Sequence, residues 1–329
     1  MQDSEERSVK KALRSDINRI SLAIIVNTVI MAAVSVTGMA ARLVIAALRS
    51  GAADPNRAFD EIINNAEFWK STSESGIEYL IFSVLGTLSV YLIIRKKAPL
   101  TQVFDKNKTM SGVSFFKCLC VFMGIQLPTV LLNMAVEAGL NQFGLTAEGG
   151  METAASQSLT VSMFVYSGLI GPIAEELIYR GFVMRALEKY GKPFAVVMSS
   201  VFFGVMHQNL IQSVFAVGVG LILGYVAMNY SVKWSILLHV INNCIFGDVL
   251  SWALKDLSAT VQDAVMWGIL GSFFVLACLI LIRERKKAAE NVKSCLCEKK
   301  YYLYTLGSVW FLVFFIGSVI MGLQVIEKI

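Results

Sequence analysis

Apolar side chains in this chain gather in long runs that are separated by short polar stretches. A run of about 17 to 25 apolar residues is long enough to cross the hydrocarbon core of a bilayer as a helix. Nine runs of roughly this length predict an all-α fold, a polytopic transmembrane bundle of about nine spans, with eight to ten as the range. The runs cover residues 20–41, 77–94, 113–134, 159–184, 193–208, 214–230, 234–250, 263–282 and 303–325.

Composition and charge support a membrane protein. Hydrophobic residues make up 56% of the chain and charged residues 16%, whereas a soluble domain carries about 25% charged residues. The net charge of +5 does not indicate a nucleic-acid partner, because most of the 29 Lys and Arg residues lie between the apolar runs. Cytoplasmic loops of membrane proteins carry such an excess. We expect an integral multi-pass protein in the lipid bilayer, the cell membrane if the source is bacterial, with a cytoplasmic N-terminus.

The pattern predicts one domain with four segments. They are a cytoplasmic N-terminal segment (1–19), N-terminal transmembrane helices with two outer loops at 42–76 and 135–158 (20–158), a core that holds the candidate chemistry (159–250), and C-terminal transmembrane helices (251–329). The stretch PNRAFDEIINNAEFWKSTSE in the first outer loop reads either as an amphipathic helix on the outer leaflet or as an exposed connector.

Two glutamates and an arginine interrupt the fourth apolar run, in GPIAEELIYRGF. An ionisable group inside a membrane helix costs about 2.5 to 3.5 kcal/mol and is a functional candidate. Glu176 and Arg180 are four residues apart, share a helix face and are expected to form an ion pair. Glu175 is turned away by about 100° and is expected to stay unpaired. An unpaired carboxylate in a low dielectric has a raised pKa, which suits a general base or acid.

Both histidines of the chain also lie in apolar runs. His207 ends FFGVMH, and His239 lies in LLHVINNC, where Asn243 follows four residues later on the same helix face. At 1.5 Å per residue, Glu175, His207 and Asn243 lie about 15, 21 and 14 Å from the cytoplasmic side. These side chains can converge between the inner leaflet and the midplane, in a cavity that admits water for hydrolysis.

The three motifs together resemble those of the CAAX prenyl protease and bacteriocin-processing family, the type II CAAX endopeptidases. GPIAEELIYRGF is similar to the family's Glu-Glu-x-x-x-Arg motif, FGVMH from Phe203 to its Phe-x-x-x-His motif, and HVINN from His239 to its His-x-x-x-Asn motif. They occur in the family's order and spacing, with the Gly-rich run FAVGVGLILGYVAMNY between the last two. The resemblance covers about 159–246.

The resemblance implies an intramembrane endopeptidase that hydrolyses a peptide bond in a membrane-associated or lipidated peptide or protein. Its catalytic residues would be Glu175, His207, His239 and Asn243, supported by Glu176 and Arg180. The first two would activate a water molecule, and the third and fourth would donate hydrogen bonds to the oxyanion of the tetrahedral intermediate. No cofactor is favoured, and a monomer would contain the whole site, so an oligomer is not required.

Three alternatives stay open. Zinc held by Glu175, His207 and His239 would make a metallopeptidase, since a catalytic zinc site has three protein ligands and an open position. Against zinc, the chain has no His-Glu-x-x-His motif. A second alternative is a non-catalytic membrane scaffold or bacteriocin-immunity protein on the same fold. The third is a transporter that uses the buried charges for ion coupling, which the absence of recognisable repeats weakens.

Overall fold

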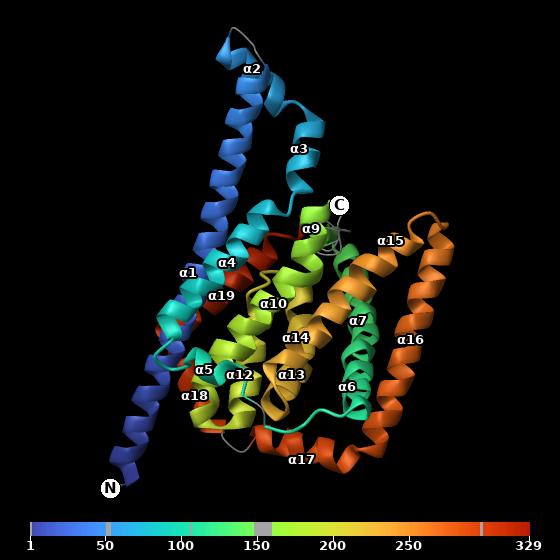
Figure 1. The fold of residues 1–329 in the computed structure, drawn as a ribbon. Coiled ribbons are helices and arrows are strands. Elements are labelled where there is room, and N and C mark those ends of the chain that lie inside the picture. Colours follow the sequence, from blue (N-terminus) through green and yellow to red (C-terminus); the bar gives the residue numbers. More distant parts are fainter. Residues whose placement is uncertain (1, 51–53, 106, 148–159, 297–298) are drawn as a thin grey trace.

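Long apolar helices make up most of the structure (Figure 1). The computed structural model describes residues 2–50, 54–105, 107–147, 160–296 and 299–329. Within these ranges, seven helices are long and apolar enough to cross a membrane, and a bent pair makes eight if it counts as one span. The predicted polytopic helical bundle is confirmed, and the chain is a multi-pass membrane protein. The boundary expected between residues 158 and 159 lies outside the described residues.

The elements divide into three groups along the chain. The first group is α1 (Gln2–Ser50), α2 (Pro55–Ile63), α3 (Ala66–Ser73), α4 (Ile77–Ile94), α5 (Leu100–Val103), α6 (Gly112–Gly124), α7 (Gln126–Asn141) and strand β1 (Leu145–Thr146). The second is α9 (Val161–Val165), η1 (Tyr166–Ile170), α10 (Gly171–Glu176), η2 (Leu177–Val183), α11 (Met184–Leu187), η3 (Glu188–Tyr190), α12 (Lys192–Val205), α13 (Leu210–Asn229), α14 (Val232–Val240), η4 (Ile241–Val249) and α15 (Leu250–Leu254). The third is α16 (Ala259–Arg283), α17 (Arg285–Leu296), α18 (Lys299–Leu306), α19 (Val309–Leu323) and strand β2 (Glu327–Lys328), which pairs antiparallel with β1.

Two of the nine predicted spans do not form a single helix that is long enough to cross a membrane. The run 193–208 forms α12, whose 14 residues reach only about 21 Å, less than the hydrocarbon thickness of about 30 Å. The run 303–325 divides into α18 and α19, which are bent by 78°. Arg14 of α1 lies against Gly307 at this bend and donates a hydrogen bond from Nε to the carbonyl of Tyr304 (3.2 Å). The arginine thus binds the carbonyl end of α18 where the chain turns.

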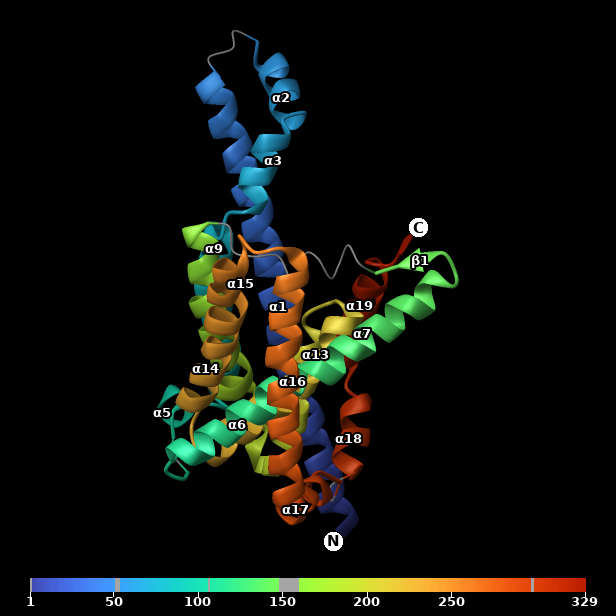
Figure 2. The ribbon, with the colours of Figure 1, turned by 90° about the vertical axis from the view of Figure 1, so that its right-hand side faces the viewer.

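The first helix is much longer than its predicted span of 20–41. Its 49 residues reach about 74 Å at 1.5 Å per residue, more than twice a bilayer core. The C-terminal part of α1 extends beyond the bundle and carries α2 and α3 (Figures 1 and 2). The predicted outer loop 42–76 is therefore largely helical. Residues 41–50 contain no Pro or Gly to end the helix.

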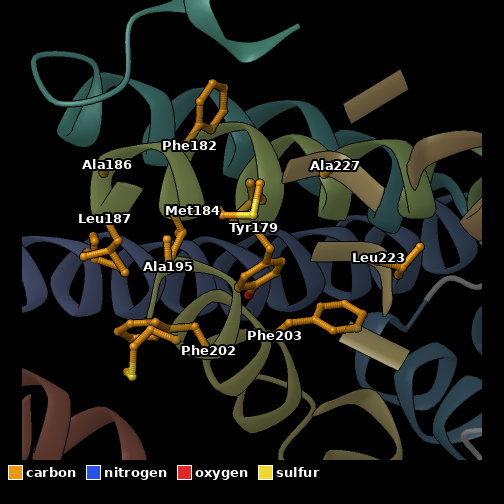
Figure 3. Close-up of a cluster of buried hydrophobic side chains, with 14 of the residues drawn as sticks. Tyr179, Phe182, Met184, Ala186, Leu187, Ala195, Phe202, Phe203, Leu223 and Ala227 are labelled. Carbon is orange, nitrogen blue, oxygen red and sulfur yellow. The ribbon is translucent and has the colours of Figure 1, made fainter. Parts of the chain in front are cut away.

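The centre of the bundle forms where α12, α13 and η2 pack on one another. The buried cluster there is drawn in Figure 3, in which the ring of Tyr179 lies beside that of Phe203, with 5.3 Å between centroids. Gly204 allows α12 to approach α13, because a Cβ atom at this position would lie 2.6 Å from the carbonyl oxygen of Ser213. Small residues permit such close backbone packing between membrane helices. The close contact fixes the end of α12, where His207 follows.

Candidate functional site

Stretches of π-helix occur at the polar motifs. The π-helical η1 and η2 flank α10, which holds Glu175 and Glu176, and the π-helical η4 holds Asn243. Pro172 has no N–H group to continue the α-helical hydrogen bonds after η1. One π-helical turn contains an extra residue, which changes where the following side chains point, and such turns are frequent at functional sites.

A single cavity of about 600 Å³ brings together the four residues predicted as catalytic. Glu175 lines it from α10, His207 from the turn after α12, His239 from α14, and Asn243 from η4. The four side chains therefore converge as the sequence predicted. The prediction assumed ideal α-helices, whereas the segments around Glu175 and Asn243 contain π-helical turns. The cavity lies among apolar helices that are long enough to cross a membrane.

Glu176 and Arg180 form the expected ion pair. Both side chains are fully buried, and Arg180 Nη1 lies 2.8 Å from Glu176 Oε1. Arg180 Nη2 also donates to the carbonyl oxygen of Gly220 on α13 (3.2 Å), and the guanidinium lies 4.4 Å from the ring centroid of Phe203 on α12. The pair therefore connects η2 with α13 and α12.

His239 lies between the two glutamates. Its Nδ1 is 3.1 Å from Glu176 Oε1 and its Nε2 is 3.7 Å from Glu175 Oε2. Glu175 was expected to be unpaired. Because α14 packs against α10, the imidazole lies within 3.7 Å of Glu175, and the two form an ion pair only when His239 is protonated. The Glu175 side chain is 25% exposed and that of Glu176 is 0% exposed. Glu175 thus lines the cavity, while Glu176 accepts a hydrogen bond from Nδ1–H of His239.

His207 occupies the tight turn between α12 and α13. Its Nδ1 lies 2.8 Å from the carbonyl oxygen of Phe203. A carbonyl only accepts, so Nδ1 carries the hydrogen and Nε2 of the neutral ring is left as an acceptor. The next residue, Gln208, has a φ of +54° and also lines the cavity. This left-handed conformation costs a non-glycine residue about 1–2 kcal/mol, and strain of this kind clusters at functional sites.

A chain of side-chain amides fixes the orientation of Asn243. Gln126 Nε2 donates to Asn242 Oδ1 (2.7 Å), Asn242 Nδ2 donates to Asn243 Oδ1 (2.9 Å), and Asn243 Nδ2 donates to the carbonyl of Ser167 (3.2 Å). An amide nitrogen has two hydrogens, so one hydrogen of Asn243 Nδ2 is left over. The motifs did not reveal Gln126, which lies on α7 and is 116 positions from Asn242. Its one sequence signal is a polar side chain inside an apolar run.

Helices outside the motif region complete the cavity wall. Asn27 of α1 and Thr87 of α4 line it, as does Tyr79 of α4, whose ring stacks on Tyr166 with 4.8 Å between centroids. None of these residues stood out in the sequence, because single polar or aromatic side chains in apolar runs carry no motif. The cavity is therefore built by the N-terminal helices as well as by the core.

The geometry does not fit a three-ligand metal site. Among the described residues, no three His, Cys, Asp or Glu side chains lie close enough together to hold a metal ion. The set Glu175, His207 and His239 is therefore not brought together as the three ligands of one ion.

Comparison with known proteins gives a family for the middle of the chain. Residues 157–245 match the family model described as Type II CAAX prenyl endopeptidase Rce1-like. The "Putative membrane peptidase YdiL" of Bacillus subtilis (strain 168) is 28% identical over 131 residues, which are 40% of this chain and 53% of that protein, so the match spans about half of the relative's length. No solved structure matches the chain. The resemblance to the CAAX prenyl protease family is confirmed.

Proposed function

We propose that this protein, whose core matches the type II CAAX prenyl endopeptidases, is an intramembrane endopeptidase. It hydrolyses a peptide bond in a membrane-associated or lipidated peptide or protein. The observation that carries the proposal is the convergence of Glu175, His207, His239 and Asn243 on one cavity among apolar helices. A proton acceptor, two imidazoles and an amide donor are what amide hydrolysis needs, whereas a scaffold or immunity protein has no use for the complete set.

In the proposed mechanism, Glu175 and His207 activate a water molecule. Glu175 faces the cavity, and His207 offers the unprotonated Nε2 because Nδ1 donates to Phe203. The Glu175 carboxylate takes a proton from the water as the water oxygen bonds to the substrate carbonyl carbon. The same proton then passes to the leaving nitrogen as the carbon–nitrogen bond breaks. A positioned base of this kind contributes about 10²- to 10⁴-fold in rate.

Asn243 and His239 stabilise the oxyanion in this mechanism. The remaining hydrogen of Asn243 Nδ2 is the first donor, held in place by the amide chain from Gln126. His239 donates from Nε2 only when both ring nitrogens carry hydrogen, because Nδ1–H is already directed to Glu176. The mechanism therefore requires His239 as an imidazolium, which lies between the two carboxylates.

We also propose that the reaction needs no metal, and chelation tests both parts of the proposal. The purified full-length protein is mixed with a quenched-fluorescent farnesylated CAAX peptide, with and without a strong zinc chelator. We expect cleavage at the same rate in both samples, because among the described residues no three candidate ligands lie close enough together to hold a metal ion. Loss of activity on chelation and its return with zinc would contradict the metal-free mechanism. If neither this peptide nor any protein in isolated membranes is cut, the endopeptidase proposal fails and a scaffold remains.

The proposed orientation has the N-terminus in the cytoplasm. The N-terminal end of α1, which carries Arg7 and Lys10, lies at the same end of the bundle as the basic helix α17 (Figures 1 and 2). The basic residues of these two segments therefore lie on one side of the bundle, as the positive-inside rule expects for the cytoplasmic side. A protease-cleavable tag at the N-terminus is expected to be cut in inverted vesicles and protected in right-side-out vesicles. The reverse pattern would contradict this orientation.

A further inference from the structure

A second cavity, of about 280 Å³, lies between α6, α13 and the junction of α16 with α17. Among the described residues, it has no lining residue in common with the cavity that holds Glu175. Gly124 of α6 lies against Ala277 of α16, where an added Cβ atom would be only 2.5 Å from the alanine Cβ. The second cavity lies about two turns from this contact on each helix, beside Lys117 and Glu284. It is thus at the end of the bundle that carries α17 and the N-terminal end of α1 (Figures 1 and 2).

Apolar side chains form the interior of the second cavity. They are Val121 of α6, Leu221 and Ile222 of α13, and Ile280 and Leu281 of α16. Leu221 is 39% exposed and Leu281 is 46% exposed, so the cavity is open at the outer surface of the bundle. Since α6 together with α7, α13 and α16 are long enough to cross a membrane, this surface faces lipid. A hydrocarbon chain can therefore enter the cavity from the bilayer without passing through water.

Polar side chains lie at one end of the second cavity. Lys117 donates a hydrogen bond to Oε1 of Glu284. Lys287 of α17 is 3.8 Å from Oε2 of Glu284, which is longer than a hydrogen bond, and its side chain is 59% exposed. The ammonium of Lys287 also hydrogen-bonds the side chain of Tyr225. An ammonium has three hydrogens, so Lys287 keeps accessible donors for an anion.

The charge around this polar end is mostly positive. Glu284 is the one carboxylate among the described residues that line the second cavity, and Lys117 neutralises it. Arg283, Arg285 and Lys286 flank it in the sequence. An apolar cavity with a cationic end fits a molecule that has a hydrocarbon chain and an anionic head. Basic pockets between membrane helices on the cytoplasmic side bind anionic lipid head groups.

We propose that the second cavity binds an anionic phospholipid, with part of one acyl chain between α6, α13 and α16 and the phosphate beside Lys287. The proposal does not depend on the endopeptidase function. The lipid would act on α13, because Leu221 follows Gly220, whose carbonyl accepts the hydrogen bond from Arg180. A bound lipid therefore holds α13 in place beside the buried ion pair, and it should stabilise the folded protein.

The first test measures lipid binding by native mass spectrometry of the delipidated full-length protein. Palmitoyl-oleoyl phosphatidylglycerol should bind, and phosphatidylcholine with the same chains should bind much more weakly. Lys287→Gln should weaken the binding of phosphatidylglycerol about fivefold, the effect of one cationic side chain near an anionic lipid. Lys286→Gln is the matched control, because it removes the same charge from a neighbouring exposed residue that does not line the cavity. Its binding should equal that of the wild type.

The second test fills the apolar part of the second cavity. Ala288 lines the cavity, whereas the next residue, Ala289, is exposed and does not. Phosphatidylglycerol should raise the thermal midpoint of the wild type and of Ala289→Phe but not that of Ala288→Phe. Glycerol phosphate, which has the anionic head without the chains, should leave all three midpoints unchanged.

Equal weakening by Lys287→Gln and Lys286→Gln, or equal binding of the two lipids, would overturn the head-group site, since it would show a general attraction to α17. A raised midpoint of Ala288→Phe with phosphatidylglycerol would overturn the placement of the acyl chain. The same rise with glycerol phosphate as with phosphatidylglycerol would identify a soluble anion as the ligand in place of a lipid. All of these measurements are independent of peptide cleavage.

Discussion

Glu175→Gln is expected to abolish peptide cleavage and leave the protein folded. Glutamine keeps the size of glutamate but cannot take a proton from water, so the rate should fall by at least about 10²- to 10⁴-fold. The fold should tolerate the change, because the Glu175 carboxylate faces the cavity and its nearest ionic neighbour, Nε2 of His239, is 3.7 Å away. The measurement is the initial rate on the farnesylated CAAX peptide, together with the thermal midpoint of the purified variant.

The neighbouring residue offers a matched control for this experiment. Glu176→Gln is the same chemical change one position along the chain, but it falls on a fully buried carboxylate that binds Arg180. It should lower the thermal midpoint strongly, whereas Glu175→Gln should not. If Glu175→Gln keeps more than a tenth of the wild-type rate, another group is the base and the proposed role of Glu175 is wrong.

The motif spacing predicted those contacts that depend on short separations along one helix. Glu176 and Arg180 meet because they are one turn apart, and this pairing survives the start of η2 between them. His239 and Asn243 line the same cavity for a similar reason. Apolar run length likewise predicted most of the helices, since a bilayer allows few other structures.

Contacts between distant segments could not be predicted in this way. The position of Gln126 beside Asn242 depends on how α7 packs against η4, and the imidazole beside Glu175 depends on how α14 packs against α10. The sequence pattern within any one helix does not predict how that helix packs against another. The length of α1 was underestimated because hydropathy marks where a span crosses lipid, whereas the helix continues beyond it.

Removing one member of the buried ion pair is expected to destabilise the protein more than any other single change considered for this chain. Arg180→Leu leaves the carboxylate of Glu176 at 0% exposure without its main counter-charge, and breaking a buried pair in this way costs about 3–5 kcal/mol. It also removes the bond to Gly220 and the contact with the Phe203 ring. The free energy of unfolding in detergent, followed by tryptophan fluorescence, measures the loss.

The double variant Glu176→Leu with Arg180→Leu tests why Arg180→Leu is destabilising. It distinguishes the cost of a buried unpaired charge from the loss of packing around the arginine side chain. Two apolar side chains leave no uncompensated charge, and such replacements are often neutral or stabilising. The double variant should therefore unfold at a higher temperature than Arg180→Leu alone. It should nevertheless have low activity, because His239 loses the carboxylate that holds its Nδ1–H at 3.1 Å. Equal stability of the single and double variants would show that packing around Arg180, and not its charge, holds η2 against α13.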